Sequence, residues 1–193
     1  SFQRSVYAKK EDETKLEAKD FDVLRLLYEE AKFHILDGRY PYEKYEELAA
    51  IQAAIEIDEK IDSQEFFRKH LDKFVPIQYH KMLENNLLGN IFNISLNRIC
   101  HKIFEDYKEI IKNAPSNYEL FKYKLIRSYL ERCWNLPYYG SAYFNGQIEK
   151  PVKGFASILS HFDIPIWIAV NRMGIHIIDK KTSVSLIIII III

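Results

Sequence analysis

Apolar residues recur every three or four positions along the first two thirds of the chain. One such stripe begins at Phe21, directly after Asp20, and ends before Gly38. This spacing places apolar side chains on one face of a helix. Aspartate is favoured at the N-cap of a helix, and glycine is favoured just past the C-terminal end. We therefore expect an amphipathic helix between Asp20 and Gly38.

The same pattern returns further along the chain. We expect helices over residues 43–57, 63–72, 94–112 and 116–134. The helix over residues 63–72 should end before Pro76, since proline lacks the donor for a helical hydrogen bond. The last should begin with a capping box, because Ser116 is followed by Glu119 three residues on. Helices of these lengths around one core predict a bundle of about 115 residues.

The hydrophobic period changes from about 3.6 to about 2 near Pro137 and Gly140. Alternation from residue 143 to 148 predicts a first strand. Residues 165–170 and 175–178 predict two more strands, joined by a short turn that ends at Gly174. The chain is therefore expected to be α+β, a helical bundle followed by antiparallel strands.

The chain ends in seven isoleucines, residues 187–193. This run is far shorter than the roughly 20 residues that span a bilayer. As a strand it would be apolar on both faces, which is unfavourable at a sheet edge. We interpret the run as an artefact at a broken end of the chain and assign it no function.

Composition indicates a folded chain. It holds 193 residues, 48% of them hydrophobic, with only 6 Gly and 6 Pro. The net charge is zero, yet residues 1–66 hold 10 basic and 17 acidic side chains and residues 67–193 hold the reverse. This split fits two solvated faces of a compact body, or a basic C-terminal surface that meets acidic lipid or peptide. The chain is not basic overall and shows no base-reading motif, so no nucleic-acid partner is predicted.

No constellation of residues indicates catalysis. The histidines are dispersed without a metal-ligand spacing, Ser141 lacks the surrounding G-x-S-x-G pattern, and neighbouring carboxylates point apart on their helices. Cys100 and Cys133 lie within apolar helical patterns and are expected to be buried thiols. We predict no enzyme activity, no metal and no cofactor. The chain begins at Ser1 without a signal pattern, so its N-terminus is interpreted as truncated or processed.

Two motifs about 100 residues apart resemble the second lobe of the FERM family. They are LLYEEAKFHILDGRYP, residues 26–41, and LPYYGSAYFNGQIEKP, residues 136–151. The first looks like the opening helix of that lobe, and the second resembles its junction with the third lobe. The resemblance implies a helical bundle of acyl-CoA-binding-protein type followed by an incomplete pleckstrin-homology-like β lobe. Residues 1–19 would be a linker or the end of a missing ubiquitin-like first lobe, residues 20–137 the second lobe, and residues 138–193 a truncated third lobe.

Two sets of residues are candidates for contacts. Contacts with the other lobe or with a partner are expected from Tyr138, Tyr139, Tyr143, Phe144 and Trp167. Contacts with an acidic phospholipid are expected from five basic residues at strand ends and turns: Lys150, Lys153, Arg172, Lys180 and Lys181. The alternative is that cations at such positions only keep the protein soluble.

The resemblance also implies a class of function. It is nearest to the FERM subgroup of non-enzymatic adaptors that bind the cytoplasmic tail of iRhom pseudoproteases and support a cell-surface sheddase complex. That subgroup implies a cytoplasmic location, peripheral at the plasma membrane. A second subgroup implies an effector of the small GTPase Rap that also binds a receptor tail. A membrane–cytoskeleton linker, or the FERM lobe of a larger signalling enzyme, is the third alternative.

Overall fold

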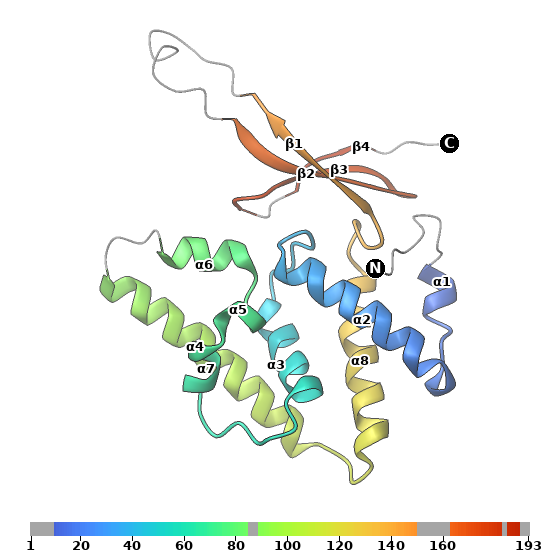
Figure 1. Ribbon diagram of the computed structural model, residues 1–193, viewed down its shortest axis with the longest axis vertical. Helices are drawn as coiled ribbons and strands as arrows, with labels where there is room; N and C mark the ends of the chain where they lie inside the picture. Colours follow the sequence, from blue (N-terminus) through green and yellow to red (C-terminus); the bar gives the residue numbers. More distant parts are fainter. Residues whose placement is uncertain (1–9, 85–88, 150–162, 183–184, 190–193) are drawn as a thin grey trace.

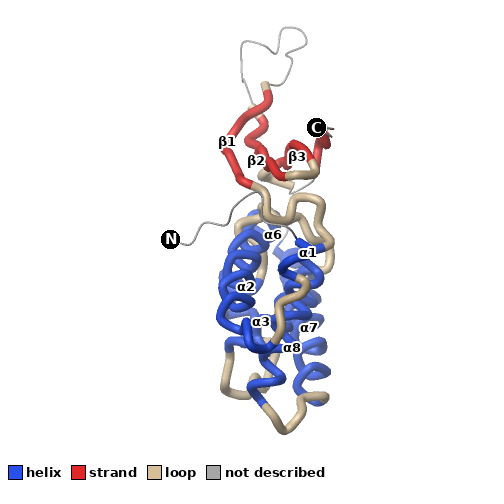
Figure 2. Tube along the Cα trace, turned by 90° about the vertical axis from the view of Figure 1, so that its right-hand side faces the viewer, coloured by secondary structure: helices blue, strands red, loops and turns tan. Residues whose placement is uncertain are grey.

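The computed structural model describes residues 10–84, 89–149, 163–182 and 185–189. The helical part comprises α1 (Lys10–Glu13), a 3-10 turn (Ala18–Asp20), α2 (Phe21–Leu36), α3 (Tyr45–Glu56), α4 (Glu65–Lys69), α5 (Leu71–Phe74), α6 (Ile77–Glu84), α7 (Gly89–Lys112) and α8 (Tyr118–Trp134). The strands are β1 (Ala142–Ile148), β2 (Ile164–Asn171), β3 (Gly174–Asp179) and β4 (Ser185–Ile189). The strands lie together at one end of the helical bundle (Figures 1 and 2). The predicted order of a helical bundle followed by antiparallel strands is confirmed.

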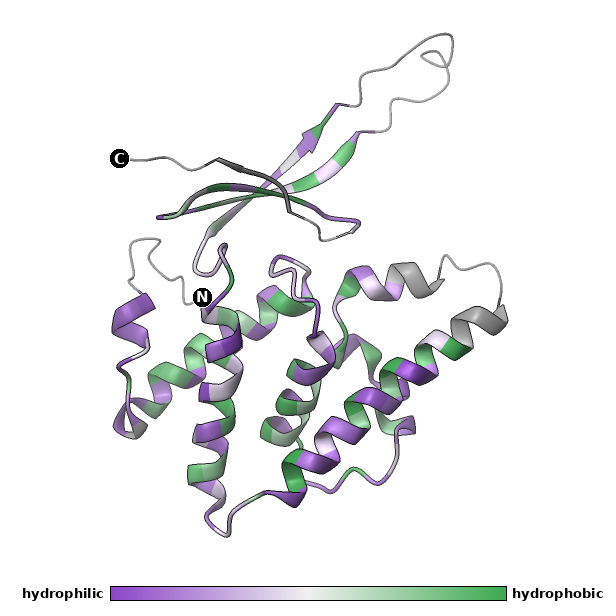
Figure 3. Ribbon diagram, turned by 180° about the vertical axis from the view of Figure 1, so that it is seen from behind, coloured by the Kyte–Doolittle hydropathy of each residue, from purple (hydrophilic) through white to green (hydrophobic). Residues whose placement is uncertain are grey.

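Helix α3 forms the centre of the bundle. It lies between α7 and α8 (Figure 3), and every residue from Leu48 to Ile55 is buried. Four of those residues are alanines, at positions 49, 50, 53 and 54. This helix is apolar around most of its circumference. Its small side chains let neighbouring helices approach closely on several sides.

The outer helices bury a single stripe each. The inner face of α8 is formed by side chains that are all buried: Phe121, Leu125, Ile126, Tyr129, Leu130 and Cys133. Tyr28 of α2 meets Tyr129 of α8 edge to face, with ring centroids 5.0 Å apart. Cys100 and Cys133 are buried free thiols, as expected.

Of the predicted helix ends, the cap at Ser116 was wrong, whereas Asp20 and Gly38 do stand at the two ends of α2. Helix α8 is capped by Asn117, whose side-chain oxygen accepts the Leu120 N–H at 3.0 Å, and not by Ser116. Asp20 stands at the start of α2, but its carboxylate accepts the Glu17 N–H instead of a donor within α2. Gly38 follows α2 with φ of 72°, the left-handed conformation that glycine adopts without strain.

The helix expected over residues 63–72 is two short helices, α4 and α5, and a further helix was missed. Pro76 also precedes a helix, since α6 begins at the next residue. The Tyr79 N–H donates to the Pro76 carbonyl at 3.0 Å. Proline is well tolerated at the first positions of a helix, where its missing N–H would be unpaired in any residue. Helix α1 was missed as well, within the stretch interpreted as a linker or the end of a missing first lobe.

The sheet has the order β1-β2-β3-β4 with antiparallel neighbours. The predicted turn between β2 and β3 is confirmed, since Asn171 pairs with Gly174. The first isoleucines of the C-terminal run belong to β4, where Ile187 and Ile189 pair with Ile177 and Ile175. This part of the run therefore forms an edge strand, a structure that the interpretation as an artefact did not anticipate. Over the described residues, no helix is long and apolar enough to cross a membrane.

Candidate functional site at the lobe junction

The chain passes from helix to strand through a tight connection. Helix α8 ends at Trp134, and the backbone turns at Gly140, where φ is 69°. Tyr138 and Tyr139 lie in this connection and are both buried. These two bulky side chains, directly before the glycine turn, belong to the hydrophobic core between bundle and sheet.

Tyr40, in the loop after α2, is the centre of an aromatic cluster. Its ring centroid lies 4.8 to 6.2 Å from the rings of His34, Tyr138, Tyr139 and Tyr143. Its hydroxyl accepts the Gly140 N–H at 2.9 Å. Ring centroids at these separations are typical of favourable aromatic pairs. A residue of the helical bundle is thus packed against both the connection and the first strand.

Tyrosine hydroxyls link this cluster to the backbone of the bundle. Tyr138 donates to the Pro41 carbonyl, and Tyr143 of β1 donates to the Arg39 carbonyl at 3.1 Å. Burial raises the pKa of both Tyr138 and Tyr143, so each hydroxyl remains protonated as a donor. Each of these donors ties the start of the β part to the loop after α2.

The N-terminal segment reaches the same junction through Glu13. This carboxylate is buried, and its Oε2 accepts from Trp134 Nε1 at 3.0 Å and from the Tyr139 hydroxyl at 2.9 Å. Arg127 of α8 secures the segment further by donating to the Thr14 and Leu16 carbonyls. The described part of the stretch predicted to be a linker or the end of a first lobe therefore packs against α8 and the connection.

The β2–β3 turn is tied to the connection from the other side. Asn171 Nδ2 donates to the Pro137 carbonyl at 2.9 Å and to the Tyr139 carbonyl at 3.4 Å. The Asn171 Oδ1 accepts the Met173 N–H at 2.8 Å, which fixes the turn itself. The sheet is thus held to the bundle at β1 and again at this turn.

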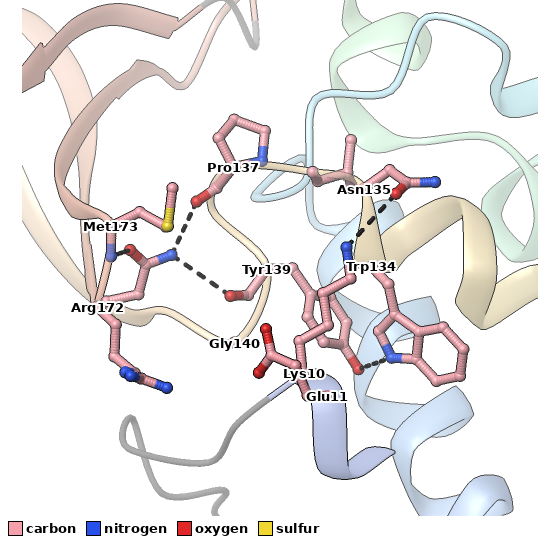
Figure 4. A pocket seen from close by; sticks show the side chains of 11 residues that line it. Lys10, Glu11, Trp134, Asn135, Pro137, Tyr139, Gly140, Arg172 and Met173 are labelled. Atoms are coloured by element: carbon pink, nitrogen blue, oxygen red, sulfur yellow. Dashed lines mark hydrogen bonds between the residues drawn. The ribbon is translucent and has the colours of Figure 1, made fainter. Parts of the chain in front are cut away.

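A cleft of about 500 Å³ opens beside these contacts (Figure 4). One wall is the β2–β3 turn, where Arg172 and Met173 lie, and Met173 is 64% exposed. The opposite wall carries Lys10 and Glu11 of α1, and the floor carries Tyr139. The cleft combines apolar side chains with the exposed Arg172 guanidinium on one wall and the charged Lys10 and Glu11 on the other.

A second cluster surrounds Trp167 of β2. The Arg39 guanidinium lies 4.3 Å from its ring centroid and the Lys180 ammonium 3.9 Å from it. Tyr143 meets the same ring edge to face at 6.3 Å. Two cations on one indole are a favourable cation–π arrangement. Arg39 also pairs with Asp37 at 2.7 Å, so this cluster joins the end of α2 to the sheet.

The structure distributes the candidate contact residues among different environments. Tyr138, Tyr139 and Tyr143 lie in the junction, and Trp167 lies in the cluster beside it. Phe144 is 56% exposed on the outer side of β1. The junction residues thus join the helical bundle to the sheet, whereas Phe144 is exposed to solvent.

The three candidate lipid contacts that the structure describes do not form one patch. Lys150 and Lys153 lie outside the described residues. Arg172 lies at one end of β3, while Lys180 and Lys181 lie at the other, about 15 to 20 Å away at the usual rise of a strand. Lys180 also donates to Asn145 and lies over Trp167, so Arg172 and Lys181 are the exposed cations among the three that are described.

Sequence reasoning missed Glu13, Arg39, Tyr40, Trp134 and Asn171. Tyr40 lies in the first quoted motif, but nothing in its spacing marks it as a junction residue. Glu13 lies in a charged stretch that is typical of a solvent-exposed segment. In the described part of the chain, no three His, Cys, Asp or Glu side chains gather as a metal site would need.

The FERM central domain model matches residues 13–144, from the buried Glu13 to the middle of β1. The chain belongs to the FERM family. FERM domain-containing protein 8 of Danio rerio is 32% identical over 192 residues, and that of Homo sapiens is 29% identical over 192 residues. Both matches cover 93% of the chain and 39% of the relative. The chain thus spans about two fifths of the length of these FERM relatives.

A solved structure supports the FERM fold. The C-terminal MyTH4-FERM domain of human Myosin 7b, in complex with the harmonin-a PDZ3 domain, matches with a TM-score of 0.55 at 19% identity. The match covers 84% of this chain and 29% of that one. At this identity the likeness concerns the fold alone.

Proposed function

We propose that this protein is a non-enzymatic FERM adaptor that binds the cytoplasmic tail of an iRhom pseudoprotease. In that role it supports the stability of a cell-surface sheddase complex, peripheral at the cytoplasmic face of the plasma membrane. The observation that carries the proposal is the match to FERM domain-containing protein 8, which extends over 93% of the chain at about 30% identity. The match includes helices and strands alike.

We propose the lobe division at residues 137 and 138, and we place the tail at the junction cleft. The cleft is walled by segments from both lobes, with Arg172 and Met173 opposite α1. A volume of about 500 Å³ has room for a few side chains of a peptide. The rim guanidinium suits a carboxylate of the tail, and the Met173 thioether suits an apolar side chain.

The cleft is also preorganised. Its floor residue Tyr139 is fixed by Glu13, and its β2–β3 wall is fixed by Asn171. A ligand that binds a preformed surface loses less free energy to ordering the protein. This property suits an adaptor whose role is to hold a flexible tail.

The test is binding of a fluorescent iRhom cytoplasmic-tail peptide, measured by anisotropy. We expect Arg172→Glu combined with Met173→Ala to weaken binding by about ten-fold or more, as loss of a charge pair and an apolar contact would. The matched control combines Lys124→Glu with Leu120→Ala, two exposed positions on α8, and should change affinity by less than about two-fold.

Two outcomes would contradict the proposal. Absence of tail binding by the unmodified protein would remove the iRhom assignment, and binding of GTP-loaded Rap in the same assay would favour the GTPase-effector alternative. Equal weakening by the cleft and control variants would keep the partner but reject the cleft as its site.

A further inference from the structure

A groove of about 480 Å³ lies between the C-terminal half of α2 and the α5–α6 segment, which are neighbours in Figure 1. Phe33 and Leu36 line it from α2, and Val75 and Ile77 line it from the other wall. None of its lining residues belongs to the junction cleft. The groove is a second concave surface, built within the helical lobe.

Two large apolar side chains on its walls remain in contact with water. Phe33 is 53% exposed and Ile77 is 46% exposed. The Phe33 ring is not loose, because the Arg39 guanidinium lies 5.1 Å from its centroid and His34 meets it edge to face. An apolar side chain inserted between the walls would remove both from water, which favours binding in proportion to the area covered.

Hydrogen bonds hold each wall in place. Lys32 Nζ lies 2.6 Å from Glu29 Oε2 and 2.6 Å from Glu56 Oε1, which fixes the α2 side. His80 Nε2 lies 2.7 Å from the Val75 carbonyl and 3.1 Å from the Leu71 carbonyl. Both partners are acceptors, so Nε2 carries the proton and donates. The groove therefore exists before any ligand arrives.

The lining residues carry more carboxylates than cations. Glu29, Asp37 and Asp72 face Lys32 and His80, and Asp37 is paired with Arg39. Lys32 is shared between two glutamates, and His80 donates to backbone carbonyls. Asp72 is exposed and has no hydrogen bond or ion pair with the described residues. A cation placed beside the apolar walls would meet this carboxylate.

We propose that this groove docks a short segment of another protein in which an aliphatic or aromatic side chain stands next to a lysine or arginine. The apolar side chain occupies the space between Phe33 and Ile77, and the cation faces Asp72. This docking surface is independent of the tail-binding function proposed for the junction cleft. It gives the helical lobe a partner surface of its own.

Three fluorescein-labelled peptides test the proposal by anisotropy: phenylalanine flanked by two lysines in a glycine background, the same peptide with glutamates for lysines, and the same peptide with glycine for phenylalanine. The first should bind about ten-fold or more tightly than the others. Ile77→Ser and Asp72→Lys should each weaken its binding about five-fold or more. The matched controls Leu120→Ser and Glu59→Lys change exposed residues elsewhere and should alter affinity by less than about two-fold.

The proposal is overturned if the three peptides bind alike, if the lysine peptide does not bind, or if the control variants weaken it equally. Sedimentation that shows a dimer abolished by Ile77→Ser would assign the groove to a second copy of the chain and also overturn it. Arg172→Glu should leave the lysine peptide unaffected. A failed iRhom assay would therefore not imply failure here, and the reverse also holds.

Discussion

The helical lobe and the sheet bury their side chains to different extents. Each of the longer helices contributes fully buried apolar side chains to one core, whereas the described side chains of β1 to β3 contribute only Ile166, Ala169 and Ile178 to the buried apolar set. Ala169 and Ile178 belong to the same continuous core as the helices. The sheet is thus a thin layer whose inner face rests on the bundle through the junction. Because the sheet buries few apolar side chains of its own, we expect the junction to stabilise the sheet more than it stabilises the helices.

The largest expected effect is at the centre of the junction. Tyr40→Ala should lower the free energy of unfolding by about 3 to 5 kcal/mol, as truncation of a buried aromatic ring does. Tyr40→Phe keeps the ring but loses the acceptor for Gly140, and should cost about 1 kcal/mol. Urea denaturation measures both. Tyr118→Ala, at an exposed tyrosine, is the control, and an equal loss there would contradict the role assigned to Tyr40.

The next effect concerns the buried carboxylate. Glu13→Gln removes the charge that accepts from Trp134 and Tyr139, and should lower stability by about 1 to 3 kcal/mol. Glu11→Gln changes an exposed neighbour and should have almost no effect. Urea denaturation measures the free energy of unfolding of both variants. Equal stability of the two would mean that the N-terminal segment contributes nothing to the body.

A smaller effect should appear at alkaline pH in the helical lobe. Burial raises the pKa of Cys100 to about 11 and that of Cys133 to about 12, from the ordinary value of 9.0. Above pH 9 the unfolded chain loses these protons while the folded chain keeps them, so stability falls as pH rises. We expect about 1 kcal/mol per thiol by pH 10. A variant with both cysteines changed to alanine should show a shallower fall, and an unchanged slope would contradict this attribution.

The smallest effect is expected at the cleft rim, in contrast to the junction behind it. Arg172→Ala and Met173→Ala should change stability by less than about 0.5 kcal/mol, because both side chains are exposed. Thermal unfolding is the measurement. A large loss at either position would mean that the rim is structural and would weaken its assignment to a partner.

Periodicity predicted the long helices and the three strands from β1 to β3 because each has a stripe or alternation that its own residues establish. The seven-residue isoleucine run has no alternation, so it did not indicate β4. The capping pattern at Ser116 was outcompeted by Asn117, an equally good cap one residue later. Such a helix boundary depends on which of two neighbouring residues caps the helix, and the spacing of residues does not distinguish them.

The junction was only partly predictable. Proline, glycine and tyrosines between residues 137 and 144 indicated where helix gives way to strand. Tyr40 and Glu13 lie about 100 residues or more from their partners, Gly140 and Tyr139. No short-range pattern records a contact of that separation. The same holds for Asn171, whose turn chemistry was evident but whose bonds to the connection were not.

The central claim is that the junction joins the bundle and the sheet into one cooperative body. The chain has two tryptophans, Trp134 at the end of α8 and Trp167 in β2, so each part carries its own fluorescent reporter. Urea unfolding of Trp167→Phe and Trp134→Phe follows each reporter alone, and far-UV circular dichroism of each variant provides the common reference. The account predicts that fluorescence and circular dichroism coincide within each variant. A Trp167 transition at clearly lower urea than the loss of helical signal in the same variant would contradict it.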